Sequence, residues 1–278
     1  MPLTPLSFRF AGAALATACC AATGSWAQNI SLGTAANFGV LAGSAVTNTG
    51  PTVVTGNVGV WPGTAITGFP PGSIAPGSGF LHSATPAAQQ AQSDLTAAYT
   101  DAATRVCATP IAGGLLGGLV LTPGVYCMPA GALTGTLTLD GAGVYIFQMA
   151  STLTTAAASS VLLQNGAVAC GVWWQVGSSA TIGTTSAMAG NVLALTSITM
   201  NTGASLGGRT LARNGAVTLD SNAVTACSGG PGPAVPAAVA LFPPTTPVPM
   251  LSTGVMILLA GLMLLGAYRA AARAGIRS

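Results

Sequence analysis

Residues that could carry acid–base chemistry are few in this 278-residue sequence. Its four acidic residues are all aspartates, it has one histidine, and it has neither lysine nor glutamate. Hydrolysis of a glycosidic bond, a common activity of β-helix enzymes, needs two carboxylates or a carboxylate beside another charged group. His82 stands alone, and Asp140 and Asp220 fall at turn positions where aspartate caps its own backbone. The sequence therefore predicts no catalytic site and no enzyme activity.

The cysteines favour disulfides over a metal site. Two of the six lie in the amino-terminal segment, and the remaining four are Cys107, Cys127, Cys170 and Cys227. No Cys-x-x-Cys spacing is present, so no metal or other cofactor is predicted. Four cysteines in an exported chain favour two disulfides among three possible connectivities. Of these we prefer Cys107 with Cys127, the closest pair in sequence, which leaves Cys170 with Cys227.

Threonine is the residue whose spacing points to binding. Five segments share the form x-Thr-aliphatic-small-(Thr/Ser/Gly), and they begin at Leu137, Ser151, Ala180, Ile198 and Val217. The last three begin 18 and 19 residues apart (198 − 180 and 217 − 198), a period that fits one coil of a solenoid with three short strands. Successive side chains of a strand point to opposite faces. We therefore expect an inward stack of Leu139, Leu153, Ile182, Met200 and Leu219, and an outward ladder of Thr138, Thr152, Thr181, Thr199 and Thr218.

These patterns predict a mostly β domain over residues 28–227. We expect a right-handed, three-faced parallel β-helix with one long α-helix packed alongside; a β-sandwich is the alternative. Thr85 can cap the helix and Pro86 can begin it, and the pattern continues to about residue 106. One stripe at helical spacing is expected to pack on the solenoid, and it contains Ala88, Ala91, Leu95, Ala98, Tyr99, Ala102 and Val106. Residues 37–49 are expected to form another coil, joined through a Gly/Pro-rich section over 63–79.

Both ends of the chain have the character of targeting segments. Residues 1–27 contain one arginine, an apolar stretch and the small-residue site Ser25-Trp26-Ala27, and are expected to be a secretory signal peptide. A Pro/Ala/Gly linker over 228–249 leads to a tail over 250–278 with eighteen largely apolar residues and three arginines. The tail resembles bacterial PEP-type sorting signals, and a plain membrane anchor is the alternative. We expect export, and attachment to a membrane through the tail.

Charge is nearly absent from the rest of the chain, since only 4% of all residues are charged. A nucleic-acid-binding protein needs a basic stripe for phosphate contacts, so this class of partner is excluded. Disorder through charge repulsion is disfavoured as well, because half of the residues are apolar. The sequence therefore predicts a folded, uncharged surface of small side chains, on a protein that we expect to be monomeric.

Several runs resemble the microbial ice-binding (antifreeze) β-helix family. They are Leu32–Ala42, Leu121–Cys127, Thr136–Asp140, Val172–Thr181, Asn191–Thr199 and Arg209–Asp220, so the resemblance spans 32–225. It implies an irregular three-faced β-helix with a long helix alongside. It also implies binding to ice through a flat face that limits crystal growth and recrystallisation.

The chemistry of threonine supports the same partner. Its hydroxyl and methyl groups can meet ordered water at fixed intervals, and β-branching restricts its rotamers. We expect ice to be contacted by a ladder at the edge of a second face, formed by Thr155, Ala157, Thr184, Ser186, Thr202, Ala204, Ser221 and Ala223. The alternative face carries Thr152, Thr181, Thr199 and Thr218. The competing function is a cell-surface adhesin or structural β-helix protein without ice activity.

Overall fold

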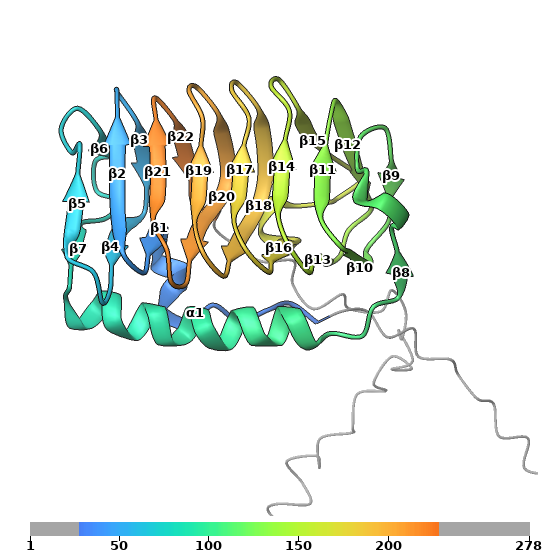
Figure 1. Cartoon of the computed structure of the whole chain (residues 1–278), viewed down its shortest axis with the longest axis horizontal. Helices are drawn as coiled ribbons and strands as arrows, with labels where there is room; N and C mark the ends of the chain where they lie inside the picture. The colour runs from blue at the N-terminus through green and yellow to red at the C-terminus, as the bar shows by residue number, and fades with distance from the viewer. Residues whose placement is uncertain (1–27, 228–278) are drawn as a thin grey trace, which may run out of the picture. The chain divides into compact units, whose positions relative to one another are not determined.

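The computed structural model describes residues 28–227, which form a parallel β-solenoid with one long α-helix along its side (Figure 1). Every strand pairing in this part of the chain is parallel. The predicted fold class, a mostly β parallel solenoid with a helix alongside, is confirmed. The predicted signal peptide (1–27), linker (228–249) and tail (250–278) lie outside the described residues. Within 28–227, no helix combines the length and the apolar character needed to cross a membrane.

One side of the solenoid is a sheet of seven short strands, which stand side by side in Figure 1. In spatial order they are β11 (Gly131–Leu133), β14 (Leu153–Thr155), β17 (Ala180–Ile182), β19 (Ile198–Met200), β21 (Val217–Asp220), β2 (Ala45–Thr49) and β5 (Ala65–Thr67). We call the outward side of this sheet the threonine face, because it carries the paired residues Thr154, Thr181, Thr199, Thr218, Thr47 and Thr67.

The other two sides share one 15-stranded sheet. The side next to the helix, the helix face, contains β8 (Thr109–Pro110), β10 (Gly124–Met128), β13 (Tyr145–Met149), β16 (Val172–Val176), β1 (Phe38–Ala42), β4 (Asn57–Val60) and β7 (Leu81–Ser83). The third face contains β9 (Val120–Leu121), β12 (Thr136–Asp140), β15 (Ser160–Gln164), β22 (Ala223–Thr225), β3 (Val53–Thr55) and β6 (Ser73–Ile74).

Two longer strands turn the corner between these faces. β18 (Ala187–Ala194) and β20 (Ser205–Ala212) each pair with third-face strands at their start and with helix-face strands at their end. Their paired residues Gly190 and Gly208 have φ values of 114° and 158°. A Cβ at Gly208 would lie 1.9 Å from the carbonyl oxygen of Gly190, so the corner requires glycine there.

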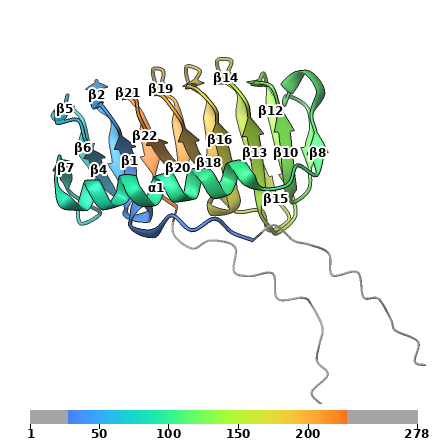
Figure 2. The same cartoon turned by 60° about the horizontal axis from the view of Figure 1, so that its bottom comes forward.

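The helix α1 (Pro86–Thr104) runs along the stack and covers the helix face (Figure 2). The Thr85 hydroxyl accepts a hydrogen bond from the Ala88 N–H at 3.3 Å, which confirms the predicted cap. The buried residues of the helix are Ala88, Ala91, Gln92, Leu95, Ala98, Tyr99 and Ala102. The inclusion of Val106 in this stripe was wrong: the helix ends at Thr104, and Val106 is 86% exposed.

The solenoid does not follow the order of the sequence. The chain begins near one end of the stack with the coil β1–β3, adds the coil β4–β6 that forms this end, and then crosses through α1 to the far end. From there the coils wind back, and the last one, β20–β22, pairs with β1, β2 and β3. In Figure 1 the blue β2 therefore stands beside the orange β21. The predicted coil over 37–49 is present, and residues 63–79 supply β5 and β6 of the coil next to it.

Two apolar clusters hold these layers together. The larger fills the interior of the solenoid and includes Leu139, Leu153, Ile182, Met200 and Leu219, which are all fully buried as predicted. They do not form one stack: Ile182, Met200 and Leu219 are in register, whereas Leu153 pairs with Ala180 and Leu139 lies on another face. The second lies between α1 and the helix face, with Leu95 and Trp173 among its members. Both predicted disulfides, Cys107–Cys127 and Cys170–Cys227, are present.

The sequence repeat itself was partly misaligned. The first copy, from Leu137, forms β12 on the third face, so Thr138 does not belong to the same ladder as the later copies. In the second copy Leu153 pairs with Ala180 and Thr154 with Thr181. Thr154, rather than Thr152, therefore lies in register with Thr181 and Thr199.

Candidate functional site

The aspartates are structural in the described chain. Asp94 accepts hydrogen bonds from the side chain of Thr34 at 2.6 Å and from its backbone N–H at 2.7 Å, and these bonds hold the pKa of Asp94 below its ordinary value of 3.8. Asp101 forms an i,i+4 ion pair with Arg105 at 2.8 Å. These interactions attach the amino-terminal segment to α1 and stabilise the end of the helix.

The other two aspartates, Asp140 and Asp220, lie at turns and away from the hollows of the described residues 28–227. Asp140 accepts a hydrogen bond from Asn165, and Asp220 from Thr202 and Ser221, so both act at turns. A surface hollow of about 620 Å³ is lined by His82 and Arg209 but by no carboxylate. No cluster of three or more potential metal-ligating side chains occurs within residues 28–227.

The most regular feature is instead a row of threonines on the seven-stranded sheet. The strand pairings join Thr154 to Thr181, Thr181 to Thr199, Thr199 to Thr218, Thr218 to Thr47, and Thr47 to Thr67. These six residues, which we call the threonine row, occupy the same place on six consecutive strands. In the first five, the residues on either side of each threonine are buried, so the threonine side chain points outward. Thr67 pairs with Thr47 at the end of its strand and is exposed. The row ends at Ala132 on β11.

A second row of small residues runs beside the first. Each of its residues lies two positions before a member of the threonine row in the sequence. On four coils the carbonyl group of this residue accepts a hydrogen bond from the adjacent strand, and these residues are Thr152, Ser179, Ser197 and Ala216. The pairing of Ala45 with Ala65 continues this second row on β2 and β5. Neither row contains a charged or long side chain. The two rows together form a surface of hydroxyl and methyl groups.

The parallel sheet sets the spacing of this surface. Neighbouring strands lie about 4.8 Å apart, and residues two apart in a strand lie about 6.7 Å apart. Hydroxyl and methyl groups therefore repeat on a rectangular grid of roughly those dimensions, which extends over six strands. A ligand that is itself periodic can meet such a grid at many points at once.

The sheet is fixed from behind and at its edge. The inward aliphatic side chains behind the sheet, among them Leu153, Ile182, Met200 and Leu219, are packed in the main core. At the corner beyond the threonine face, the Thr155 hydroxyl accepts a hydrogen bond from the Gly183 N–H at 2.8 Å and lies 3.3 Å from the Ser186 hydroxyl. Asn222 donates to the carbonyl oxygens of Asn201 and Ala204 in the next coil. These bonds hold successive turns in register, so the grid is stiff.

The eight residues from Thr155 to Ala223 that were expected to contact ice are divided between the interior and the surface. Thr155, Ser186 and Ala204 are 4%, 0% and 0% exposed, so the expectation that they point outward was wrong. Thr155 pairs in register after Thr154 and thus occupies the inward position that Ile182 and Met200 hold on the next strands. The other members remain accessible. Ala157, Thr184 and Thr202 are exposed on turns, Ser221 is half-buried, and Ala223 is exposed on the third face.

The alternative ladder is brought together on the threonine face. Thr181, Thr199 and Thr218 are consecutive members of the threonine row, and Thr152 belongs to the second row of the same face. Sequence reasoning missed Thr154, Thr47 and Thr67. The segment Val46-Thr47-Asn48 places a threonine between two inward residues, as Ile198-Thr199-Met200 does. This alternation could have marked Thr47, although not its neighbour in space.

The third face is less uniform. Its outward row pairs Thr136, Ser160, Ala187, Ser205, Ala223, Val53 and Ser73 in turn. Only one of these seven residues is threonine. Exposed apolar side chains of Val53, Val120 and Leu162 interrupt the surface. The threonine face is thus the more regular of the two faces that α1 does not cover.

Comparison with known proteins agrees with this architecture. Residues 40–225 match the family model described as Ice-binding-like. An "Ice-binding protein" from Nostoc sp. (strain HG1) is 50% identical over 200 residues, which cover 70% of this chain and 73% of that protein. One from Colwellia sp. is 37% identical over 213 residues, covering 71% and 83%. The crystal structure of an ice-binding protein from the Antarctic ascomycete Antarctomyces psychrotrophicus has a TM-score of 0.70 and 44% identity, covering 73% of this chain and all of that one.

Proposed function

This chain belongs to the Ice-binding-like family, and we propose that it binds ice crystals through the threonine face. The observation that carries the choice of face is the threonine row, six in-register threonines on consecutive parallel strands. Ice binding limits the growth and recrystallisation of the crystals to which the protein is attached. It requires no catalytic group, so the function is non-enzymatic.

The composition of the two rows suits a ligand made of water. A charged side chain holds its own hydration shell, and a long one loses conformational entropy when it is ordered against a surface. The rows consist of Thr, Ser and Ala, whose side chains lose little or no such entropy. Ordered water can be held by the hydroxyl groups and can fit between the methyl groups. The exposed turn residues Thr184 and Thr202 border this surface and extend it at one edge.

Rigidity contributes as much as composition. A surface that had to be ordered on contact would lose that entropy from its affinity. The inward side chains and the corner hydrogen bonds of Thr155 and Asn222 fix the threonine face before ice arrives. One chain supplies the whole face, so a monomer is sufficient for binding.

The compartment follows from the covalent chemistry. Two disulfides form and persist in an oxidising environment, which agrees with an extracellular domain. We propose further that residues 1–27 direct export and that the apolar, arginine-ended tail over 250–278 holds the domain at a membrane or is processed there. A domain tethered in this way would attach a cell to ice or protect its envelope.

Ice-affinity partition of the domain tests this function against the adhesin alternative. Residues 28–227 would be expressed under oxidising conditions and a slowly growing ice surface would be drawn through the solution. Enrichment of the domain in the ice fraction, relative to a charged globular protein of similar size, is the expected result. Exclusion into the liquid fraction would instead support a surface protein without ice activity.

A further inference from the structure

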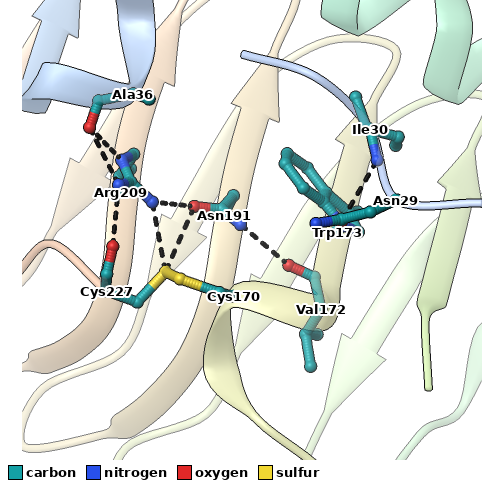
Figure 3. The surroundings of a disulfide bond; sticks show 9 residues. All are labelled: Asn29, Ile30, Ala36, Cys170, Val172, Trp173, Asn191, Arg209 and Cys227. Atoms are coloured by element: carbon teal, nitrogen blue, oxygen red, sulfur yellow. Dashed lines mark hydrogen bonds between the residues drawn. A yellow bond between two sulfur atoms is a disulfide. The ribbon is translucent and has the colours of Figure 1, made fainter. Parts of the chain in front are cut away.

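Arg209 is a buried arginine in a chain that has almost no charge. It lies on β20 and is 7% exposed. Its Nε and Nη2 groups donate to the carbonyl oxygen of Ala36 at 3.0 and 2.8 Å, and Nη2 also donates to the carbonyl oxygen of Cys227 at 2.8 Å. Nη1 donates to Asn191 Oδ1 at 2.9 Å and lies 3.1 Å from Cys227 Sγ (Figure 3). The guanidinium thus uses its full set of donors.

None of these partners is a carboxylate. A buried charge without a counter-ion is costly unless hydrogen bonds replace its hydration. Burial accordingly lowers the pKa of Arg209 from its ordinary value. An aliphatic side chain would be less costly to bury at this position, so the contribution of the charged guanidinium is its hydrogen bonds to other segments.

Those segments come from both ends of the domain. Ala36 lies in the short 3-10 helix Gly33–Asn37, which directly precedes β1, and Cys227 closely follows β22, the last strand. Cys227 is also joined by a disulfide to Cys170, and the Trp173 indole donates to Asn29 Oδ1 at 3.0 Å. Figure 3 shows both chain ends held around the same short stretch from Cys170 to Trp173.

The same junction divides the threonine row. Thr218 belongs to the last coil and Thr47 to the first, and their strands β21 and β2 are paired in the sheet. The turns that follow these strands are joined by the bond from the Asn222 N–H to Thr52 Oγ1 at 3.0 Å. β20, which carries Arg209, pairs with β1 at this junction. A shift of the first coil would therefore displace Thr47 and Thr67 from the other four threonines.

We propose that Arg209 is a positioning residue of the ice-binding face, which holds the first coils in register with the last so that Thr47 and Thr67 continue the row. The proposal rests on the proposed function. Arg209 does not contact ice, because it lies on the helix face rather than on the threonine face. It acts through the backbone of β1 and the turn that leads to β2.

The test is a double-mutant comparison of thermal hysteresis. Arg209→Gln removes the charge and most donors. Arg213→Gln is the matched control, because the guanidinium of Arg213 lies over the Tyr99 ring at 4.8 Å, whereas that of Arg209 is bonded to Ala36 and Cys227. Arg209→Gln should lower thermal hysteresis. In the Arg209→Gln background, adding Thr67→Tyr should cause no further loss, because Thr67 is already out of register. Adding Thr181→Tyr in the same background should still reduce the hysteresis. In the Arg213→Gln background both tyrosines should reduce activity. An equal fold-loss from Thr67→Tyr in the wild-type and Arg209→Gln backgrounds would overturn the proposal.

Hydrogen exchange supplies a readout that does not depend on ice. Amides of β2 should exchange at least several-fold faster in Arg209→Gln than in Arg213→Gln, while those of β17 stay unchanged; equal β2 rates would contradict the proposal. If Arg209→Gln does not fold, Arg209→Lys, which keeps the charge but cannot reach both chain ends with a planar fork, takes its place. If Thr181→Tyr leaves the thermal hysteresis of the wild type unchanged, the threonine face is not the ice-binding face. The exchange rates of β2 then still show whether Arg209 holds the first coil in place.

Discussion

Thr218 on β21 and Thr47 on β2 are paired neighbours in the threonine row, although one belongs to the last coil of the domain and the other to the first. The candidate surface is therefore assembled from both ends of the chain. Its four carboxyl-terminal members come from successive coils, and its two amino-terminal members are added when the chain closes on itself. Residues that secure this closure should influence ice binding without touching ice.

The two disulfides should contribute unequally to stability. Cys170–Cys227 encloses a sequence separation of 57 residues and Cys107–Cys127 one of 20. Since a longer loop loses more entropy on cross-linking, removing the first bond by Cys→Ser substitution at both positions should cost about 1 kcal/mol more than removing the second. Urea unfolding of the two double variants measures this difference. A larger loss from the Cys107–Cys127 pair would contradict it.

Acid should remove the contribution of Asp94. Hydrogen bonds from the Thr34 side chain, and next from its backbone, lower the pKa of Asp94 from 3.8 in the folded state. The unfolded chain then binds more protons at low pH, so this stabilisation is present above pH 3.8 and is lost as the pH falls through the folded pKa. Asp94→Asn should lower Tm at neutral pH and have no such effect well below pH 3.8. Thr34→Ala serves as the control, because in that background the pH dependence of the Asp94→Asn effect should shrink.

Thr155 should matter for stability but not for ice. Thr155→Val keeps the shape of the side chain and removes the oxygen that accepts from the buried Gly183 N–H. An unsatisfied buried donor should lower the free energy of unfolding by about 1–3 kcal/mol. Thermal hysteresis per folded molecule should be unchanged, since Thr155 is 4% exposed. Loss of hysteresis without loss of stability would contradict this prediction and show that Thr155 belongs to the ice-binding surface.

Local patterns predicted much of this fold. Thr85 and Pro86 mark the start of α1, and its buried stripe follows from helical spacing alone. The alternation of inward and outward residues in β17, β19 and β21 is equally local, which is why the inward stacking of Ile182, Met200 and Leu219 was predicted correctly. Pairing of the closest cysteines also gave the right disulfides.

The register between neighbouring strands and the pairing of the first coil with the last depend on residues far apart in the sequence, so local patterns could not predict them. The segment from Ser151 to Thr155 contains three threonines, so either Thr152 or Thr154 fits the repeat, and only the pairing of Leu153 with Ala180 decides between them. An outward threonine on β12 has the same local pattern as one on β19, although they lie on different faces. Nothing local to Thr47 indicates that its neighbour is Thr218.

The face of contact can be tested by one substitution and its matched control. Thr199→Tyr places a bulky side chain in the middle of the threonine row, and Thr225→Tyr makes the same change at an exposed strand position on the third face. Thermal hysteresis of the two variants, each with an unchanged Tm, is the decisive measurement. We predict that Thr199→Tyr removes most of the activity and Thr225→Tyr leaves it near the wild-type value. The reverse pattern would place the ice contact on the third face and contradict this account.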